Sequence, residues 1–133
     1  TRGLKMLCAN PDIQVDRGNQ RIYCAGAIAQ AYEDMGGIAH NFGKPHAPIY
    51  DLARNRLNAI AGHVVDDKHI LCIGDGIRTD IRGAVMEDLD SLFVTGGLAA
   101  AETDTNEQPD PTKLDDFLRA SQLTPTYSIG HLR

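Results

Sequence analysis

Short apolar runs alternate with amphipathic segments along this chain, and that alternation is what most constrains its fold. The apolar runs, which predict β-strands, occupy residues 4–9, 69–73, 91–95 and 126–129. The amphipathic segments, in which apolar residues recur at spacings of three and four, occupy residues 25–35, 49–60, 79–88 and 111–118. Strands that alternate with helices form βαβ units. We therefore predict an α/β fold with a mostly parallel sheet.

Turn-forming residues mark the ends of these elements. Asn10-Pro11-Asp12 ends the first strand, and the loop is expected to continue through Asn19 and Gln20. Gly36-Gly37 is expected to end the helix that begins at Ala25. Residues 99–111 are predicted to form a solvated surface loop, and Asp110 is the expected N-cap of the last helix.

The composition narrows the class of protein. Hydrophobic residues make up 42% of the 133 residues, which is ordinary for a globular domain. Thirteen Lys and Arg against 18 Asp and Glu give a net charge of −5, which argues against nucleic-acid binding. The apolar runs are too short to predict a membrane span. Three cysteines without a C-x-x-C motif favour a reducing compartment, so we expect a cytoplasmic protein.

Two carboxylates follow the apolar run that ends at Ile73. Asp75 comes directly after the predicted buried strand, and Asp80 stands at the start of the next helix. In open α/β sheets, reactive groups gather at the carboxyl ends of the strands. Two carboxylates across such a turn suit Mg²⁺, which takes a few carboxylates, waters and phosphate oxygens. The alternative is a capped turn that binds no ligand, since both residues also suit a helix N-terminus.

A lysine stands at the start of the second predicted helix, in Gly43-Lys44-Pro45-His46. Helix N-termini favour anions, so Lys44 is a candidate phosphate-binding residue. The alternative is a solvated lysine before a proline that begins a helix. Together, a strand-end acidic pair and a helix-start lysine suit phosphoryl transfer, in which positioning and charge neutralisation dominate.

A second acidic and histidine-rich group lies around the turn at 66–68. It contains His63, Asp66, Asp67 and His69, residue types that ligate metals. The group flanks a turn that precedes a strand, so it lies at the opposite end from Asp75. We therefore interpret it as a solvated loop.

The motifs, in this order, resemble those of the haloacid dehalogenase (HAD) superfamily, in its class IIA branch of NagD and p-nitrophenyl phosphatase-like enzymes. They are Gly43-Lys44-Pro45, the run from Ile73 to Ile81, and Val94-Thr95-Gly96-Gly97. Residues 8–12, with Gly26 and the helix that ends at Gly36, resemble the stretch in which these enzymes leave their cap domain. The resemblance covers about residues 4–130. It implies a three-layer HAD-like, Rossmann-like core, with its C-terminal part at residues 38–133 and a cap remnant at 1–37.

The resemblance also implies roles for individual residues. Lys44 would be the catalytic lysine that steadies the nucleophile and binds the transferring phosphoryl group. Asp75 would be the Mg²⁺ ligand, and Asp80 would be the supporting acidic residue of the same motif, grouped with Lys44 among the catalytic residues. Asn10 and Asp12 would bind substrate at the cap entrance. The implied activity is Mg²⁺-dependent hydrolysis of a small phosphorylated metabolite through an aspartyl-phosphate.

One departure from the family concerns the nucleophile. The family uses an Asp-x-Asp motif after an N-terminal strand, and the one Asp-x-Asp here, Asp88-Leu89-Asp90, precedes a strand instead. We therefore expect a C-terminal half that lacks the nucleophile and is inactive alone. Self-association, or pairing with the missing N-terminal half, is expected. The alternatives are a non-catalytic module that binds phosphate or a partner and, more weakly, a receiver-like domain that is phosphorylated at Asp75.

Overall fold

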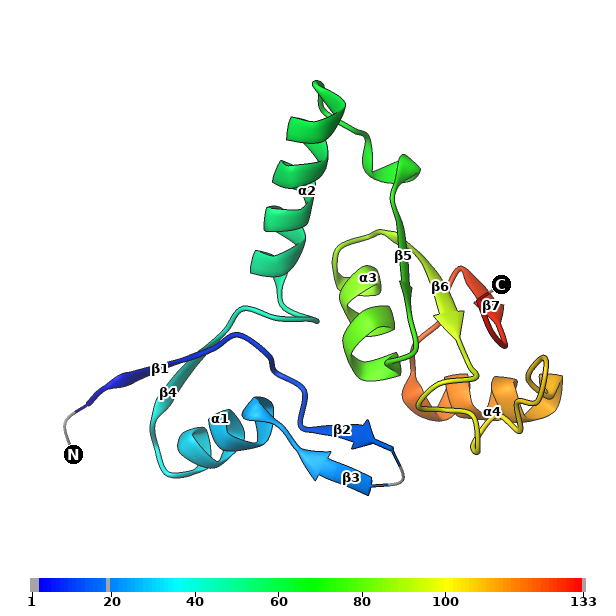
Figure 1. Ribbon diagram of the computed structural model, residues 1–133, viewed down its shortest axis with the longest axis horizontal. Coiled ribbons are helices and arrows are strands. Elements are labelled where there is room, and N and C mark those ends of the chain that lie inside the picture. Colours follow the sequence, from blue (N-terminus) through cyan, green and yellow to red (C-terminus); the bar gives the residue numbers. More distant parts are fainter. Residues whose placement is uncertain (1–2, 19, 133) are drawn as a thin grey trace. The chain divides into compact units, whose positions relative to one another are not determined.

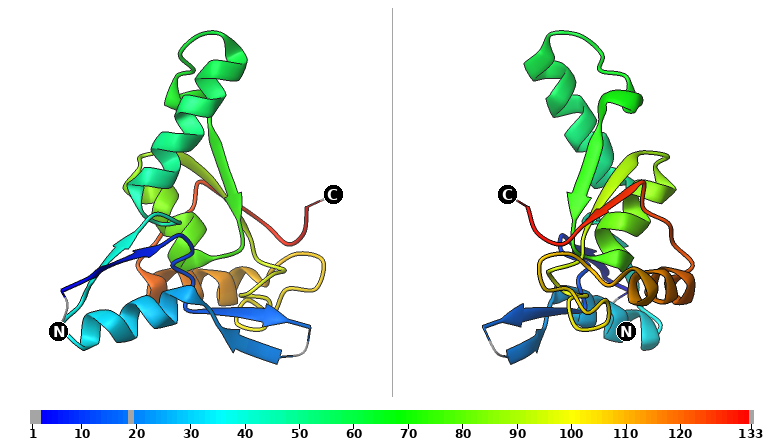
Figure 2. Two further views of the ribbon diagram at one scale, coloured as in Figure 1. Left: turned by 60° about the vertical axis from the view of Figure 1, so that its left-hand side comes forward. Right: turned by 90° about the vertical axis from the view of Figure 1, so that its right-hand side faces the viewer.

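A computed structural model describes residues 3–18 and 20–132 and divides the chain into two compact units, Thr1–Ala53 and Arg54–Arg133. Figure 1 labels the helices and strands of both units, and Figure 2 shows them from two further directions. Parallel strands joined through helices are present in each unit. The predicted α/β class is thereby confirmed.

The first unit is built on a pair of parallel strands, β1 (Lys5–Cys8) and β4 (Ile38–Asn41). Their register places Cys8 opposite Asn41, so both strands end at the same edge. Helix α1 (Ala25–Asp34) packs against both strands and buries Gly26 and Ala29. This is the crossover connection that parallel strands require.

The end of α1 follows the predicted glycine pattern. Gly36 has a φ of +83°, in the left-handed region that favours glycine. The backbone N–H of Gly37 donates to the carbonyl oxygen of Tyr32 at 2.9 Å, which satisfies one of the last carbonyls of the helix. A Cβ added at Gly37 would overlap the ring of Tyr32. Two glycines are therefore needed here for different reasons.

The loop predicted between Asn10 and Gln20 is wrong in its second half, because the chain forms an antiparallel hairpin there. Its strands are β2 (Gln14–Arg17) and β3 (Gln20–Tyr23), which pair Val15 with Ile22. Gly18, at a φ of +61°, lies in the turn, and Asn19 lies outside the described residues. All four residues of β3 are exposed, so the hairpin carries little of the apolar alternation that predicts a strand.

The second unit contains a parallel three-stranded sheet in the order β5 (Leu71–Gly74), β6 (Asp90–Val94) and β7 (Tyr127–Ile129). Its core is centred on Phe93 and Ile81, both fully buried. Helix α4 (Pro111–Ser121) covers this core, and the Phe93 and Phe117 rings stack with centroids 6.0 Å apart. Helix α2 (Ala47–Ala61) precedes the sheet in sequence.

The helix predicted at 79–88 is shorter and begins differently. A π-helical turn, η2 (Ile77–Ile81), is followed by α3 (Arg82–Met86). The carbonyl oxygen of Gly76 accepts N–H bonds from Asp80 at 2.8 Å and Ile81 at 3.1 Å, which widens the first turn. The strand predicted from His69 begins at Leu71, because Asp67–His69 form a 3₁₀ turn, η1.

The segment before α4 combines a correct and an incorrect prediction. Asp110 is the N-cap, as predicted, and its Oδ1 accepts the backbone N–H groups of Thr112 and Lys113, both at 2.9 Å. The solvated loop predicted at 99–111 is wrong in part, since Ala99 is 4% exposed and Thr103 is completely buried. This segment is an ordered component of the second unit.

Strand β5 has the composition of a central strand but pairs only with β6 among the described residues. Leu71 and Ile73 are 44% and 50% exposed, although apolar residues on both faces are typical of strands with a neighbour on each side. The predicted boundary between a cap remnant at 1–37 and a core at 38–133 stays a prediction. Over the described ranges, no helix has both the length and the apolar character that a membrane span needs.

Candidate functional site

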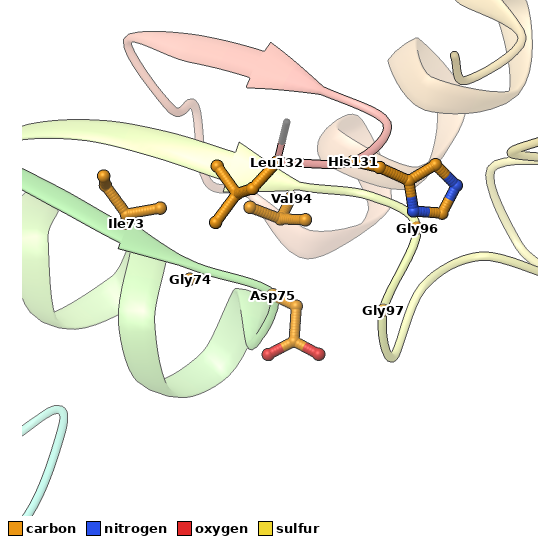
Figure 3. Close-up of a pocket in the computed structure, with 8 residues that line it drawn as sticks. All are labelled: Ile73, Gly74, Asp75, Val94, Gly96, Gly97, His131 and Leu132. Carbon is orange, nitrogen blue, oxygen red and sulfur yellow. The ribbon is translucent and has the colours of Figure 1, made fainter. Parts of the chain in front are cut away.

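Asp75 lies at the carboxyl end of β5, beside the ends of β6 and β7. The three strands are parallel, so their carboxyl ends share one edge of the sheet. A cavity of about 350 Å³ opens there, and Figure 3 shows the side chains that line it. They are Ile73, Gly74, Asp75, Val94, Gly96, Gly97, His131 and Leu132. Asp75 is the one carboxylate among them.

The Asp75 carboxylate is held from the side by the loop that follows β6. Its Oδ2 accepts the backbone N–H of Leu98 at 3.1 Å. A Cβ added at Gly97 would overlap the Asp75 side chain, so this close approach requires glycine. Within the described ranges, Oδ1 of Asp75 has no hydrogen-bond partner. One carboxylate oxygen is therefore oriented by the loop, and the other is available to a ligand.

Asp80 stands under the same turn and supports it from inside. The residue is 8% exposed, and its Oδ2 accepts the backbone N–H of Gly76 at 3.0 Å. A Cβ added at Gly74 would overlap the Asp80 carboxylate. Asp75 and Asp80 thus belong to one turn, but different groups hold them.

Asp75 and Asp80 can provide only some of the ligands that a divalent cation needs. Within the described ranges, no group of three His, Cys, Asp or Glu side chains could hold a metal. Mg²⁺ does not need such a group, because one or two carboxylates with waters and substrate phosphate are sufficient. A half-buried carboxylate with one oxygen free at a cavity mouth is a suitable donor. The chain can therefore offer Asp75 as one ligand of such a site, with the other positions left to other donors.

In the first unit, residues 42–46, here called the lysine loop, lie beside the Asn10–Asp12 turn. The backbone N–H of Phe42 donates to the carbonyl oxygen of Cys8 at 2.9 Å, which joins the two segments where β1 and β4 end. A Cβ added at Gly43 would overlap the ring of Pro11. Asn10 Oδ1 accepts the backbone N–H of Asp12 at 3.2 Å, which closes the turn.

The predicted site residues are thus divided between the two units. Lys44, which is exposed and joined to Pro45 by a cis peptide bond, belongs to the first unit together with Asn10 and Asp12. Asp75 and Asp80 belong to the second. Each set lies at the carboxyl ends of a parallel strand pair.

Three contacts around Asp75 could not be predicted from the sequence. Gly97 is the last residue of the Val94-Thr95-Gly96-Gly97 motif and Leu98 follows it, but no local pattern shows that their backbone reaches Asp75. His131 lines the cavity, and its Nε2 lies 2.7 Å from the carbonyl oxygen of Asn106. Both contacts join segments far apart in sequence.

The candidates rejected from the sequence lie at the other end of the sheet. The parallel register places Asp90 opposite Leu71, the first residue of β5, whereas Asp75 follows its last residue. The Asp88-Leu89-Asp90 segment is therefore remote from Asp75. This geometry agrees with our rejection of these residues as the nucleophile.

The residues around 66–68 have structural partners. Lys68 Nζ lies 2.8 Å from the Asp66 carboxylate, and this hydrogen bond, with that from the Lys68 backbone, lowers the pKa of Asp66. Asp67 forms an ion pair with Arg54 at 3.0 Å. These contacts agree with our interpretation of this segment as a solvated loop.

Comparison with known proteins places the chain in a family. The model of HAD-hydrolase-like proteins matches residues 41–120. A hydrolase of the haloacid dehalogenase-like family from Brucella suis 1330 is 40% identical and has a TM-score of 0.77. That match covers 99% of this chain and 45% of the Brucella chain.

Two further relatives are more distant. A p-nitrophenyl phosphatase from Archaeoglobus fulgidus shares the fold, with 23% identity, a TM-score of 0.68, and coverage of 96% of this chain and 44% of that one. A dihydroxyacetone phosphatase from Corynebacterium glutamicum (strain R) is 26% identical over 98 residues, which are 73% of this chain and 34% of the relative. The chain thus spans less than half the length of these proteins. It belongs to the haloacid dehalogenase-like hydrolase family, as its motifs predicted.

Proposed function

We propose that this chain is part of a Mg²⁺-dependent phosphomonoester hydrolase that acts on a small phosphorylated metabolite. The observation that supports this best is the Asp75 carboxylate, fixed at the carboxyl end of β5 by Leu98 with its second oxygen free at a cavity. The reaction would proceed through an aspartyl-phosphate on a residue outside this chain, since the one Asp-x-Asp present lies at the wrong end of the sheet.

In this proposal, the second unit provides the metal-binding carboxylate. Asp75 would hold Mg²⁺ through its free oxygen, and bound Mg²⁺ would neutralise charge on the phosphoryl group. Asp80 would act as the supporting acidic residue of the motif. Its bond to the Gly76 N–H keeps the turn in the conformation that presents Asp75.

The first unit would provide contacts to the substrate. Lys44 would steady the nucleophile and donate charge-assisted hydrogen bonds to the phosphoryl oxygens. Asn10 and Asp12 would contact the part of the substrate beyond the phosphate. The packing of Gly43 against Pro11 supports these roles, because it holds the lysine loop beside the Asn10–Asp12 turn.

The substrate class rests on the relatives. The Corynebacterium relative is named dihydroxyacetone phosphatase, and the Archaeoglobus structure is named p-nitrophenyl phosphatase. Small phosphorylated compounds are therefore the class to test first. A cytoplasmic location, where such metabolites occur, is part of the proposal.

The test compares two aspartates with the same substitution in the full-length polypeptide. Asp75→Asn should abolish Mg²⁺-dependent hydrolysis of p-nitrophenyl phosphate, because the amide is a far weaker ligand for Mg²⁺. Asp88→Asn is the matched control: Asp88 is exposed and has a φ of +55°, which Asn tolerates. Retained activity in Asp75→Asn would overturn the assignment.

A second function, that of a non-catalytic module that binds a partner, is favoured by the edge of β5. Leu71 and Ile73 are half-exposed on a strand whose outer edge is unpaired among the described residues. Such an edge favours pairing with another strand, from a second copy or from the N-terminal half of the protein. Phosphatase assays of the full-length polypeptide decide between the two, since Mg²⁺-dependent turnover supports the hydrolase and absence of turnover supports the module. For the 133-residue chain alone we expect no turnover under either function, and turnover would show that the chain holds its own nucleophile.

A further inference from the structure

We infer that Thr105 is a positioning residue, whose hydroxyl holds the loop after β6 in the conformation that orients Asp75. The inference rests on the proposed function only in giving Asp75 the metal-binding role. Figure 1 shows this loop in yellow, between β6 and α4. It is the segment that the sequence predicted to be solvated.

Three threonine hydroxyls form a connected line inside this loop. Thr105 Oγ1 donates to Thr95 Oγ1 at 2.9 Å and lies 2.7 Å from Thr103 Oγ1. Thr95 Oγ1 in turn donates to the carbonyl oxygen of Ile129 in β7 at 3.3 Å. Thr95 and Thr103 are fully buried. A buried polar network is stabilising only when its members are all paired.

The hydroxyl protons show how this line is joined. Each hydroxyl has one proton: Thr95 donates its proton to the carbonyl oxygen of Ile129, and Thr103 donates its proton to the carbonyl oxygen of Ala99. The proton of Thr105 is therefore the one that serves the contacts among the hydroxyls, with Thr95 Oγ1 and Thr103 Oγ1 as its acceptors. Thr105 is the one member that joins both neighbours.

The line of hydroxyls ends next to the residue that binds Asp75. The carbonyl oxygen of Ala99 accepts two hydrogen bonds from Thr103, one from the Thr103 backbone N–H and one, at 2.7 Å, from the Thr103 hydroxyl. Leu98, directly before Ala99, donates its N–H to Asp75. Hydrogen bonds, together with the covalent backbone of Leu98 and Ala99, therefore form a connected set between β7 and the carboxylate of Asp75.

Removal of the Thr105 hydroxyl would interrupt this set without leaving a buried group unpaired. In Thr105→Val, Thr103 keeps its hydroxyl bond to Ala99, and Thr95 keeps its bond to Ile129. The loop would lose its attachment to β7 through the hydroxyls, and the Leu98 N–H would be held less firmly.

The test measures hydrogen exchange by NMR in the 133-residue chain. We expect Thr105→Val to reduce the protection of the Leu98 amide about tenfold and to leave that of Phe93, in the central strand, unchanged. Thr105→Ser, which keeps the hydroxyl, should retain protection. Thr124→Val, at an exposed threonine of the same unit, is the matched control.

Each result decides the inference. Unchanged Leu98 protection in Thr105→Val, or equal losses at Leu98 and Phe93, would overturn it, because Thr105 would then have no effect on the loop or a general one. A Mg²⁺ titration of the same samples separates this outcome from failure of the proposed function. Absence of Mg²⁺ binding in the wild type would refute the metal site, whereas the exchange data would still decide the role of Thr105.

Discussion

Arg54 joins three segments of the second unit, and its replacement by Met tests how that unit is held together. Its Nε and Nη2 donate to the two carboxylate oxygens of Asp67 at 3.1 and 3.0 Å. Its Nη1 donates to Glu87 Oε2 at 2.6 Å, and Nη2 also reaches the Glu87 carbonyl oxygen at 3.3 Å. Hydrogen bonds to Asp67 and Glu87 raise the pKa of Arg54, so it stays charged.

The two partners should contribute unequally to stability. Asp67 makes the largest contribution to the raised pKa, but its side chain is 47% exposed, so water replaces Arg54 there and the loss is below about 1 kcal/mol. The Glu87 side chain is 15% exposed, so it would be left as a poorly hydrated carboxylate without Arg54. The loss of this partner should cost about 2 kcal/mol of stability. Met preserves the packing of the aliphatic stem. We expect Arg54→Met to lower the free energy of unfolding by about 2–3 kcal/mol.

Urea unfolding, followed by the NMR resonances of the β5–β7 sheet, measures this change in the second unit. Double-mutant cycles then separate the partners. The coupling of Arg54→Met with Glu87→Gln should be about 2 kcal/mol. Its coupling with Asp67→Asn should be below about 1 kcal/mol. A coupling to Asp67 as large as that to Glu87 would refute the argument from burial.

Three further changes test other parts of the structure. Gly97→Ala places a Cβ against Asp75 and should weaken Mg²⁺ binding about tenfold to a hundredfold, measured by calorimetric titration; unchanged affinity would exclude the close approach. Asp110→Ala removes the α4 cap and should lower the free energy of unfolding by about 1 kcal/mol in urea. Lys68→Met removes the main cause of the lowered Asp66 pKa, so that pKa should rise toward its ordinary value in an NMR pH titration. Because the folded pKa is lowered, Asp66 contributes stability above its ordinary pKa and loses it as pH falls through the lowered value.

Local chemistry explains which elements the sequence could predict. Asp110 and Pro111 act on the helix that they begin, so cap and helix follow from adjacent residues. The hairpin at 14–23 was missed because it pairs mostly exposed polar residues. The strand at 71–74 was predicted from its apolar run. Its exposure could not be predicted, because exposure depends on which segments pack beside the strand.

The candidate site also contains residues that local sequence patterns predict and residues that they do not. Asp75 and Asp80 could be proposed from the sequence because a carboxylate after an apolar run is a local pattern, and their roles stay a prediction. The support given by Gly97 and Leu98 was not, since the Leu98 N–H lies 23 positions along the chain from Asp75. Thr103 appeared solvated because its neighbours in the sequence are polar, whereas in the structure it is buried and contacts Ala99 and Thr105.

The most direct test of the account is whether Asp75 binds Mg²⁺. In an NMR titration of the 133-residue chain with Mg²⁺, the amide resonances of Gly74, Asp75 and Gly76 should shift in the wild type. The same resonances should not respond in Asp75→Asn, and those of Asp66 and Asp67 should be unaffected in both. Equal shifts in the wild type and Asp75→Asn, or none in the wild type, would contradict the assignment of Asp75 as the metal ligand.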